Sequence, residues 1–169
     1  MATETISYAS KGTLTITLAS LATNSTFVGG QESTQVDNSS NLYSDATVEG
    51  FISVGTTPTA GEIQIWVYGS FHTSVATTNI DTLDGADSAE TFTSIGVRDG
   101  AVKFGARLIV DSTTSNVKYA IAPFSVAELF GGSMPKFWGV WVTHNTVAAL
   151  NSTGGNHEIS YTGIKYDIA

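Results

Sequence analysis

Apolar and polar residues alternate along several short stretches of the chain, with the two-residue period of a β-strand that buries one face. In the stretch 13–21, Leu14, Ile16 and Leu18 share one face and threonines occupy the other. The same pattern places Phe71 and Phe104 on the inward faces of two later strands. Strands are expected at 13–21, 46–54, 62–71, 103–110, 117–121, 136–144 and 158–168, with weaker candidates at 5–9 and 26–28.

Proline and glycine positions predict where these strands end. Pro123 is expected to end the strand at 117–121, because proline has no N–H to donate to a ladder. Asp99-Gly100 has the composition of a tight hairpin turn, since both residue types tolerate a positive φ. The other turn-rich stretches are 28–30, 37–41, 55–58 and 151–156.

Short strands at this spacing predict an all-β chain folded as an antiparallel two-sheet sandwich, with a jelly roll as the natural variant at 169 residues. An immunoglobulin-like sandwich stays open as an alternative, although the cysteines of an antibody-type domain are absent. The chain has no internal repeat and no linker, so residues 1–169 are expected to form a single domain. Residues 1–10 are either part of the sandwich or an extended arm.

One short helix is expected near 125–130. Ser125 and Glu128 have the spacing of a capping box, in which each side chain satisfies a free N–H at the start of a helix. Gly131-Gly132 follows, where a left-handed C-terminal cap favours glycine. This helix is short enough to serve only as a plug between strands.

The charge balance excludes one class of partner. The formal net charge is −8, and only seven lysines and arginines are scattered along the chain. Binding to a phosphate backbone depends on such residues, so no nucleic acid partner is expected. No apolar run approaches the roughly 18 residues that span a bilayer, and the start lacks a leader pattern. With no cysteine, these features predict a protein made in a reducing cytoplasm, with no membrane partner.

No residue pattern indicates catalysis. The chain has no cysteine nucleophile and no G-x-S-x-G elbow, and its histidines, His72, His144 and His157, have no partner at the spacing of a triad or a zinc site. The sequence therefore predicts no enzyme, no catalytic residue and no cofactor. A pair of glycosidase carboxylates is the one catalytic arrangement that sequence spacing leaves open.

The acidic stretch 81–90 carries the weak metal candidates Asp81, Asp84 and Asp87 around a glycine. Carboxylate oxygens are the ligands that a hard cation such as calcium requires. The spacing of three residues differs, however, from the two-residue spacing with which a 12-residue calcium loop begins. A solvated surface loop is the expected state of this stretch, with calcium binding as the alternative.

Two groups of aromatic residues are candidates for a protein interface. Trp66 and Tyr68 lie two apart on the outward parity of their strand, where they either meet a neighbouring subunit, stack on a sugar or are covered by the chain's own loops. Phe137 and Trp141 fall on one face of the next strand and Trp138 on the other. A strand that is apolar on both faces is either central in a sheet with a cover, for which the short helix is a candidate, or part of an oligomer interface.

The stretch Ser133-Met134-Pro135-Lys136-Phe137-Trp138-Gly139-Val140-Trp141-Val142-Thr143-His144-Asn145-Thr146, followed by Ala148-Ala149-Leu150-Asn151 and a closing strand, resembles small structural proteins of tailed bacteriophages. The resemblance covers about a third of the chain. It implies a virion component, of which a capsid decoration (cement) protein is the type expected at this length. Such a protein binds the major capsid protein on the outer capsid surface and is often a homo-oligomer, with a trimer as one option.

Two functions are therefore carried forward. The first is a non-enzymatic decoration protein that stabilises neighbouring capsid subunits, with free strands near the N-terminus available to extend a neighbour's sheet. The alternative is a carbohydrate-binding or receptor-binding module of a fibre or tail, in which Trp66 and Tyr68 stack on sugar and the 81–90 loop adds polar contacts.

Overall fold

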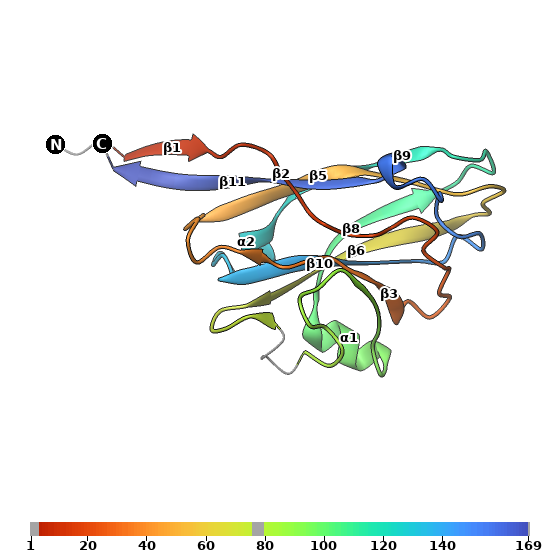
Figure 1. Cartoon of the computed structure of the whole chain (residues 1–169), viewed down its shortest axis with the longest axis horizontal. Helices are drawn as coiled ribbons and strands as arrows, with labels where there is room; N and C mark the ends of the chain where they lie inside the picture. Colours follow the sequence, from red (N-terminus) through yellow and green to blue (C-terminus); the bar gives the residue numbers. More distant parts are fainter. Residues whose placement is uncertain (1–3, 76–79, 169) are drawn as a thin grey trace.

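The computed structural model describes residues 4–75 and 80–168, and it consists mainly of two antiparallel β-sheets stacked face to face (Figure 1). The all-β, two-sheet sandwich predicted from the alternation pattern is confirmed. The predicted strands at 103–110 and 158–168 match the observed bounds, and most of the others agree to within a residue or two. Alternating apolar side chains are therefore a sufficient signal for most of this fold.

The first sheet has the strand order β1-β11-β5-β9, with the short β2 beside β11. Its strands are β1 (Glu4–Tyr8), β2 (Gly12–Thr13), β5 (Asp45–Ser53), β9 (Lys118–Ser125) and β11 (Glu158–Ile168). The second sheet has the order β7-β3-β10-β6-β8, with β4 beside β10. Its strands are β3 (Gly29–Glu32), β4 (Val36–Asp37), β6 (Gly61–Ser70), β7 (Ser88–Thr91), β8 (Lys103–Val110) and β10 (Phe137–His144).

The connections between the sheets have jelly-roll topology. The first strand pairs with the last, and the chain then passes back and forth between the sheets so that β3, β10, β6 and β8 lie opposite β1, β11, β5 and β9. This interleaved order is that of two Greek keys rolled together. It confirms the jelly-roll variant and replaces the immunoglobulin-like alternative.

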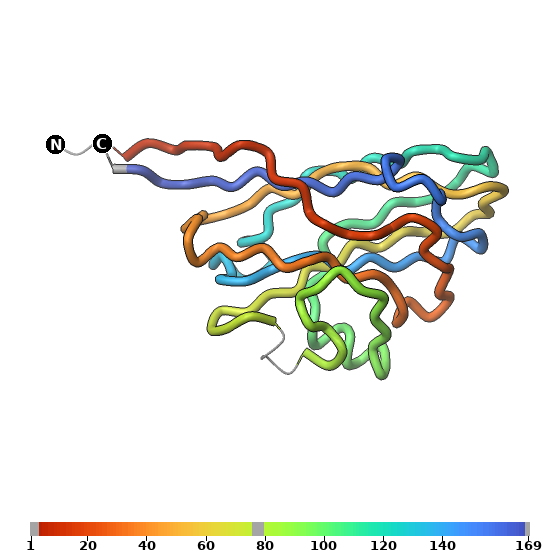
Figure 2. Tube along the Cα trace, viewed as in Figure 1, coloured from red at the N-terminus to blue at the C-terminus, as the bar shows by residue number. Residues whose placement is uncertain are grey.

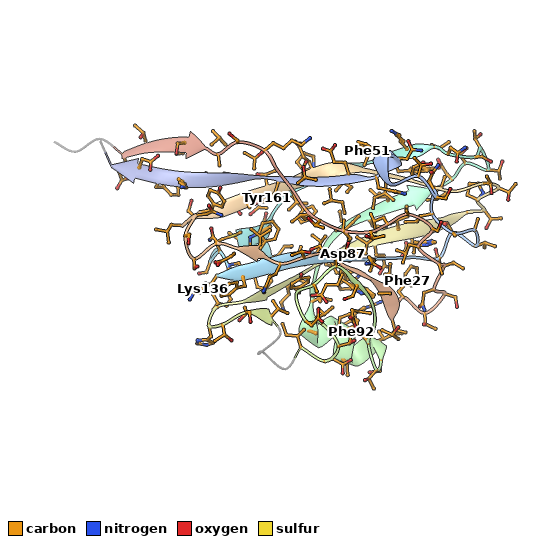
Figure 3. The ribbon with its side chains drawn as sticks, viewed as in Figure 1. Phe27, Phe51, Asp87, Phe92, Lys136 and Tyr161 are labelled. Carbon is orange, nitrogen blue, oxygen red and sulfur yellow. The ribbon has the colours of Figure 1, made fainter. Side chains whose placement is uncertain are left out.

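The main core fills the space between the sheets. Trp138, Val140 and Val142 project inward from β10, and all three are fully buried. Tyr161 of β11, labelled in Figure 3, meets the Trp138 ring edge to face at a centroid distance of 5.2 Å. The predicted parity of β10 is therefore confirmed, because Trp141 lies on the opposite face of the same strand.

The predicted short helix is present as α2 (Val126–Leu129). The Ser125 hydroxyl accepts the Glu128 N–H at 3.0 Å, and Gly131 and Gly132 both have a positive φ, as the caps predicted. A second helix, α1 (Ile95–Ala101), was not expected. The helix contains Asp99-Gly100, so the predicted hairpin turn there is wrong. Ser94 caps the N-terminus of the helix, which begins at Ile95 and continues through both residues.

The stretch 13–21 is not a strand beyond Thr13, although its alternation correctly predicts that Leu14 and Leu18 are buried. The reason is that this segment crosses from one sheet to the other. Leu14 donates its N–H to Ile159 in the first sheet, whereas Thr15 accepts an N–H from Thr34 beside the second.

Glycine and proline were misleading as markers of turns and strand ends at two places. Gly29 and Gly30 lie inside β3 rather than in a turn. Position 30 requires glycine for another reason, because a Cβ there would stand 2.8 Å from the Trp141 ring. Pro123 lies inside β9 instead of ending it, because β9 is an edge strand and Pro123 falls where the β5–β9 register shifts between Val48 and Gly50.

Both exposed phenylalanines were assigned to the wrong face. Phe104 is 44% exposed because a bulge at Gly105 shifts the β6–β8 register between Ile65 and Trp66, which turns Phe104 to the outer face. Phe71 is 49% exposed because β6 ends at Ser70, so the strand's parity no longer constrains it.

Within the possible N-terminal arm, residues 4–8 are β1, which pairs along its length with β11 of the same chain. The two strands form a ribbon that projects beyond the rest of the sandwich (Figure 2). The remaining part of the arm at residues 1–3 lies outside the described residues.

Candidate functional site

The outer face of the second sheet is covered by the chain's own covering segment, which we define as residues 71–75 and 80–102 between β6 and β8 (Figure 1). Beneath it lies a second hydrophobic core with its own buried members: Trp66, Tyr68, Val75, Leu83, Phe92, Val102 and Trp141. The expectation that the short helix covers β10 is wrong, because α2 packs against β5 and β8 beside the main core. The cover is instead the long connection between β6 and β8.

Trp66 has no free ring face. The Arg98 guanidinium lies 4.4 Å from its ring centroid, and Phe104 meets it edge to face at 5.0 Å. Its indole N–H donates to the Gln64 side chain at 3.0 Å. Only 8% of Trp66 is exposed, so the chain itself occupies the surface on which a sugar would stack.

Tyr68 is fully buried and donates its hydroxyl to the Ser33 carbonyl at 2.5 Å. It lies across Gly139, where an added Cβ would stand 2.2 Å from the hydroxyl oxygen. Of the other interface candidates, Trp138 and Trp141 are fully buried and Phe137 is partly buried. The five aromatic candidates thus build the two cores of this chain, and little of their surface faces outward.

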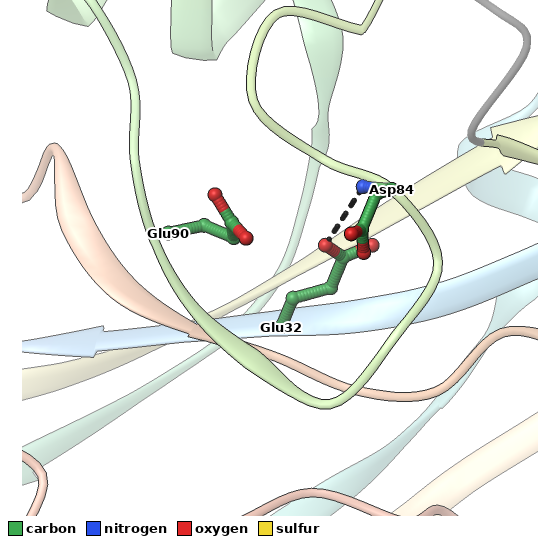
Figure 4. Close-up of side chains that lie close together, drawn as sticks. All are labelled: Glu32, Asp84 and Glu90. Carbon is green, nitrogen blue, oxygen red and sulfur yellow. Dashed lines mark hydrogen bonds between the residues drawn. The ribbon is translucent and has the colours of Figure 1, made fainter.

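A carboxylate cluster ties the covering segment to β3. The Glu32 side chain is completely buried, and its two oxygens accept the N–H groups of Asp84 at 3.0 Å and Gly85 at 2.7 Å. The carboxylates of Asp84 and Glu90 lie next to it, with oxygens of all three within 4.8 Å of one another (Figure 4). Glu90 is in turn bonded by the hydroxyls of Thr82 and Ser88.

Burial raises the pKa of Glu32 to about 7. The negative charge of Asp84 adds to this increase, whereas the two backbone N–H groups and the neighbouring Tyr68 hydroxyl oppose it. Burial also raises the pKa of Tyr68, with the Glu32 carboxylate as the next cause. The carboxylate cluster therefore contains a carboxyl group, that of Glu32, which changes protonation near neutral pH.

The three predicted metal candidates are not brought together. Asp81 accepts the N–H and hydroxyl of Thr93, and Asp87 accepts the N–H and hydroxyl of Thr17. Only Asp84 lies in the carboxylate cluster, with Glu32 and Glu90, which sequence spacing did not single out. The three carboxylates have the oxygen chemistry of a hard-cation site, but both Glu32 oxygens already accept peptide N–H groups.

The acidic stretch is therefore part of the folded structure and not a freely solvated loop. It ends in β7, and Asp87 also accepts a side-chain N–H of Gln31 at 2.6 Å. Side-chain bonds to β3 and to the segment before it thus hold the stretch in place.

The side chains of two histidines contact backbone carbonyl groups. His144 is fully buried, with Nε2 2.9 Å from the Leu21 carbonyl and Nδ1 3.0 Å from the Thr146 hydroxyl. His157 contacts the Asn151 carbonyl through Nε2 at 2.8 Å. Burial lowers the pKa of both rings. These contacts fasten loops at one end of the sandwich.

Five of the ten large apolar side chains that are exposed among the described residues lie on segments at the other end, which is on the left in Figure 1 and includes β1 and the end of β11. We call this region the apolar end and define it by five residues: Ile6, Tyr8, Leu42, Phe71 and Tyr166, which are 56%, 72%, 74%, 49% and 64% exposed. Next to Lys136, labelled in Figure 3, a hollow of about 520 Å³ is lined by side chains that include Leu42, Phe71 and Met134. A second hollow of about 590 Å³ lies against Tyr166 and α2.

Leu42 is held in place by the turn that carries it. The Asn38 side chain accepts the Tyr43 N–H at 2.8 Å and donates to the Tyr43 carbonyl at 3.0 Å. Leu42 itself donates its N–H to the Asn38 carbonyl and has a φ of 55°, which is unfavourable for a leucine. A strained backbone that is braced on both sides holds this apolar side chain out into solvent.

No protein-family model matches the chain, and a search of curated proteins finds no similar sequence. Among the described residues, no helix has both the length and the apolar character needed to cross a membrane.

Proposed function

We propose that this protein is a non-enzymatic structural subunit of a bacteriophage particle, a capsid decoration protein that binds neighbouring major capsid subunits on the outer surface of the shell. The observation that carries the proposal is Leu42, an apolar side chain that its turn keeps 74% exposed at the edge of a hollow that Phe71 and Met134 also line. Isolated exposed leucines are common, but an exposed leucine beside further apolar side chains that line one hollow favours a binding role.

The rest of the apolar end supports a protein partner. Protein interfaces are commonly anchored by apolar and aromatic side chains. Such side chains line one hollow, at Leu42, Phe71 and Met134, and Tyr166 lies beside the other. Tyr43 and Lys136 supply polar groups at the rim of the first hollow. A partner with a complementary apolar projection would remove both hollows from water.

The jelly-roll fold and the phage-like stretch at 133–151 agree with this proposal. Jelly rolls form viral capsid domains as well as lectins. The lectin-like alternative loses its expected platform, because Trp66 and Tyr68 are covered by the chain itself. A rigid sandwich with one apolar end suits a subunit that binds several copies of a protein lattice.

Binding to shells that lack the protein tests the proposal with a matched pair of variants. Leu42 and Val147 are both highly exposed, at 74% and 65%, and both have a left-handed backbone, with φ of 55° and 61°. Leu42 lies in the loop before β5 and Val147 in the loop after β10, and these two loops are at opposite ends of the sandwich. Asparagine tolerates this conformation, so neither L42N nor V147N should harm folding. Loss of a docked leucine is worth about 1.5–3 kcal/mol, so L42N should bind at least about tenfold more weakly.

V147N should bind such shells with the affinity of the wild-type protein, and both variants should melt at the wild-type temperature. Failure of the wild-type protein to bind shells of its own phage would exclude a decoration role. Normal binding by L42N would exclude the apolar end as the contact surface.

A further inference from the structure

The outer edge of β1 is an unprotected strand edge. Among the described residues, β1 is the last strand of the first sheet and pairs on one side only, with β11. Ala9 donates its N–H to Gly163 of β11 at 2.8 Å, and donors alternate in direction along a strand. Thr5 and Ser7 therefore direct their N–H groups to β11, whereas Glu4, Ile6 and Tyr8 direct theirs outward.

The other sheet edges carry devices that discourage pairing. Pro123 and Lys118 lie in β9, and β8 contains Lys103, Arg107 and a bulge. The fourth edge strand, β7, is only four residues long. Lysines, prolines, bulges and short strands are the means by which proteins avoid edge-to-edge association. β1 is only one residue longer than β7, but it has no lysine, no proline and no bulge among its described residues, which favours a further strand as its partner.

The β1–β11 ribbon is also apolar on one face. Ile6 lies opposite Tyr166, and Tyr8 lies opposite Ile164, so these four side chains share a face of the ribbon. Ile6, Tyr8 and Tyr166 are all more than half exposed. A two-stranded ribbon is only marginally stable in water, and further strands would stabilise it.

We propose that β1 pairs antiparallel with β1 of a second copy of this chain, which forms a two-fold symmetric dimer with one continuous sheet. Pairing centred on Ile6 places Ile6 opposite Ile6 of the second copy and Glu4 opposite Tyr8 of the second copy. The only charge on β1 therefore faces a tyrosine, and no like charges meet. The same register aligns the outward donors and acceptors of all three outward-facing residues with their counterparts.

This arrangement closes at two copies, because the same strand forms both halves of the contact. It also joins the apolar faces of the two ribbons into one larger surface. A trimer, one option that the phage resemblance implies, cannot form through this self-pairing of β1.

Sedimentation equilibrium of the full chain tests the proposal with the variants I6P and I6T. Proline at Ile6 removes an outward N–H and leaves the bonds to β11 intact, whereas threonine keeps the donor and the strand preference. The wild-type protein should have twice the 17.7 kDa mass of one chain. The dimer dissociation constant of I6P should be at least tenfold higher than that of I6T.

A monomer at all concentrations, a trimer, or equal dissociation constants for I6P and I6T would each overturn the proposal. Pairing of β1 with a strand of a capsid protein instead would leave the free protein monomeric and would make I6P, but not I6T, defective in binding to shells. Because mass is measured without shells, failure of the dimer and failure of the decoration role are separate results.

Discussion

Replacing Glu32 with glutamine should remove a pH dependence of stability worth about 3 kcal/mol. The pKa of Glu32 is raised from 4.5 to about 7 in the folded protein, so the folded state binds its proton more tightly than the unfolded state does. The resulting stability is fully present below about pH 4.5 and is lost as the pH rises through about 7. The wild-type advantage over E32Q should therefore shrink across this range.

The comparison with E32Q isolates this group from the histidines. The pKa of His144 and of His157 is lowered, so their contribution runs the other way and is lost as the pH falls below about 6.5. Both histidines are present in both proteins and cancel in the difference.

Urea unfolding of both proteins at a series of pH values measures the effect. A difference in unfolding free energy that stays constant from about pH 4 to about pH 9 would mean that Glu32 does not titrate near neutrality. If E32Q fails to fold, the carboxyl carbon shift of Glu32 in the wild-type protein, followed by NMR, reports the same titration directly.

Trp141→Ala should destabilise the protein by about 3–5 kcal/mol, as expected for removing a buried tryptophan from a packed core. Trp141 is fully buried, meets Phe92 edge to face at 5.0 Å, and fills the space that Gly30 leaves open. Because these contacts join the covering segment to the second sheet, hydrogen exchange should accelerate first at Phe92 and Leu83, whose N–H groups bond to Val28 and Ile80.

Trp138→Ala is the matched comparison, because Trp138 lies on the opposite face of the same strand in the main core. It should cost a similar free energy but lower the protection of both sheets together. A loss below about 1 kcal/mol for Trp141→Ala, or identical exchange patterns for the two variants, would contradict the assignment of a separate core under the covering segment.

The alternation of apolar and polar residues was sufficient to predict a strand where that strand has one buried face or is buried on both faces. It identified β10 as apolar on both parities, and the structure places this strand in the centre of its sheet. It failed at residues 13–21, because a crossing segment also buries alternate residues. Gly29-Gly30 resembled a turn because glycine has the same signature wherever it makes room, here for the ring of a tryptophan more than a hundred residues later.

The site residues were harder to predict for a physical reason. Glu32 is an isolated acidic residue in the sequence, and only strand pairing brings it under the backbone of Asp84 and Gly85. Leu42 follows a turn-rich stretch in which nothing marks it as exposed. An apolar residue directly after such a stretch is the one signal that could have drawn attention to Leu42.

The location and orientation of this protein in a particle test the proposed function most directly. The proposal predicts that a reconstruction of a phage particle containing this protein shows jelly-roll density on the outer surface of the shell, with the apolar end at Leu42 and Phe71 against the major capsid protein. Density for this fold at a tail or fibre tip, or on the shell with the apolar end pointing into solvent, would contradict the proposal.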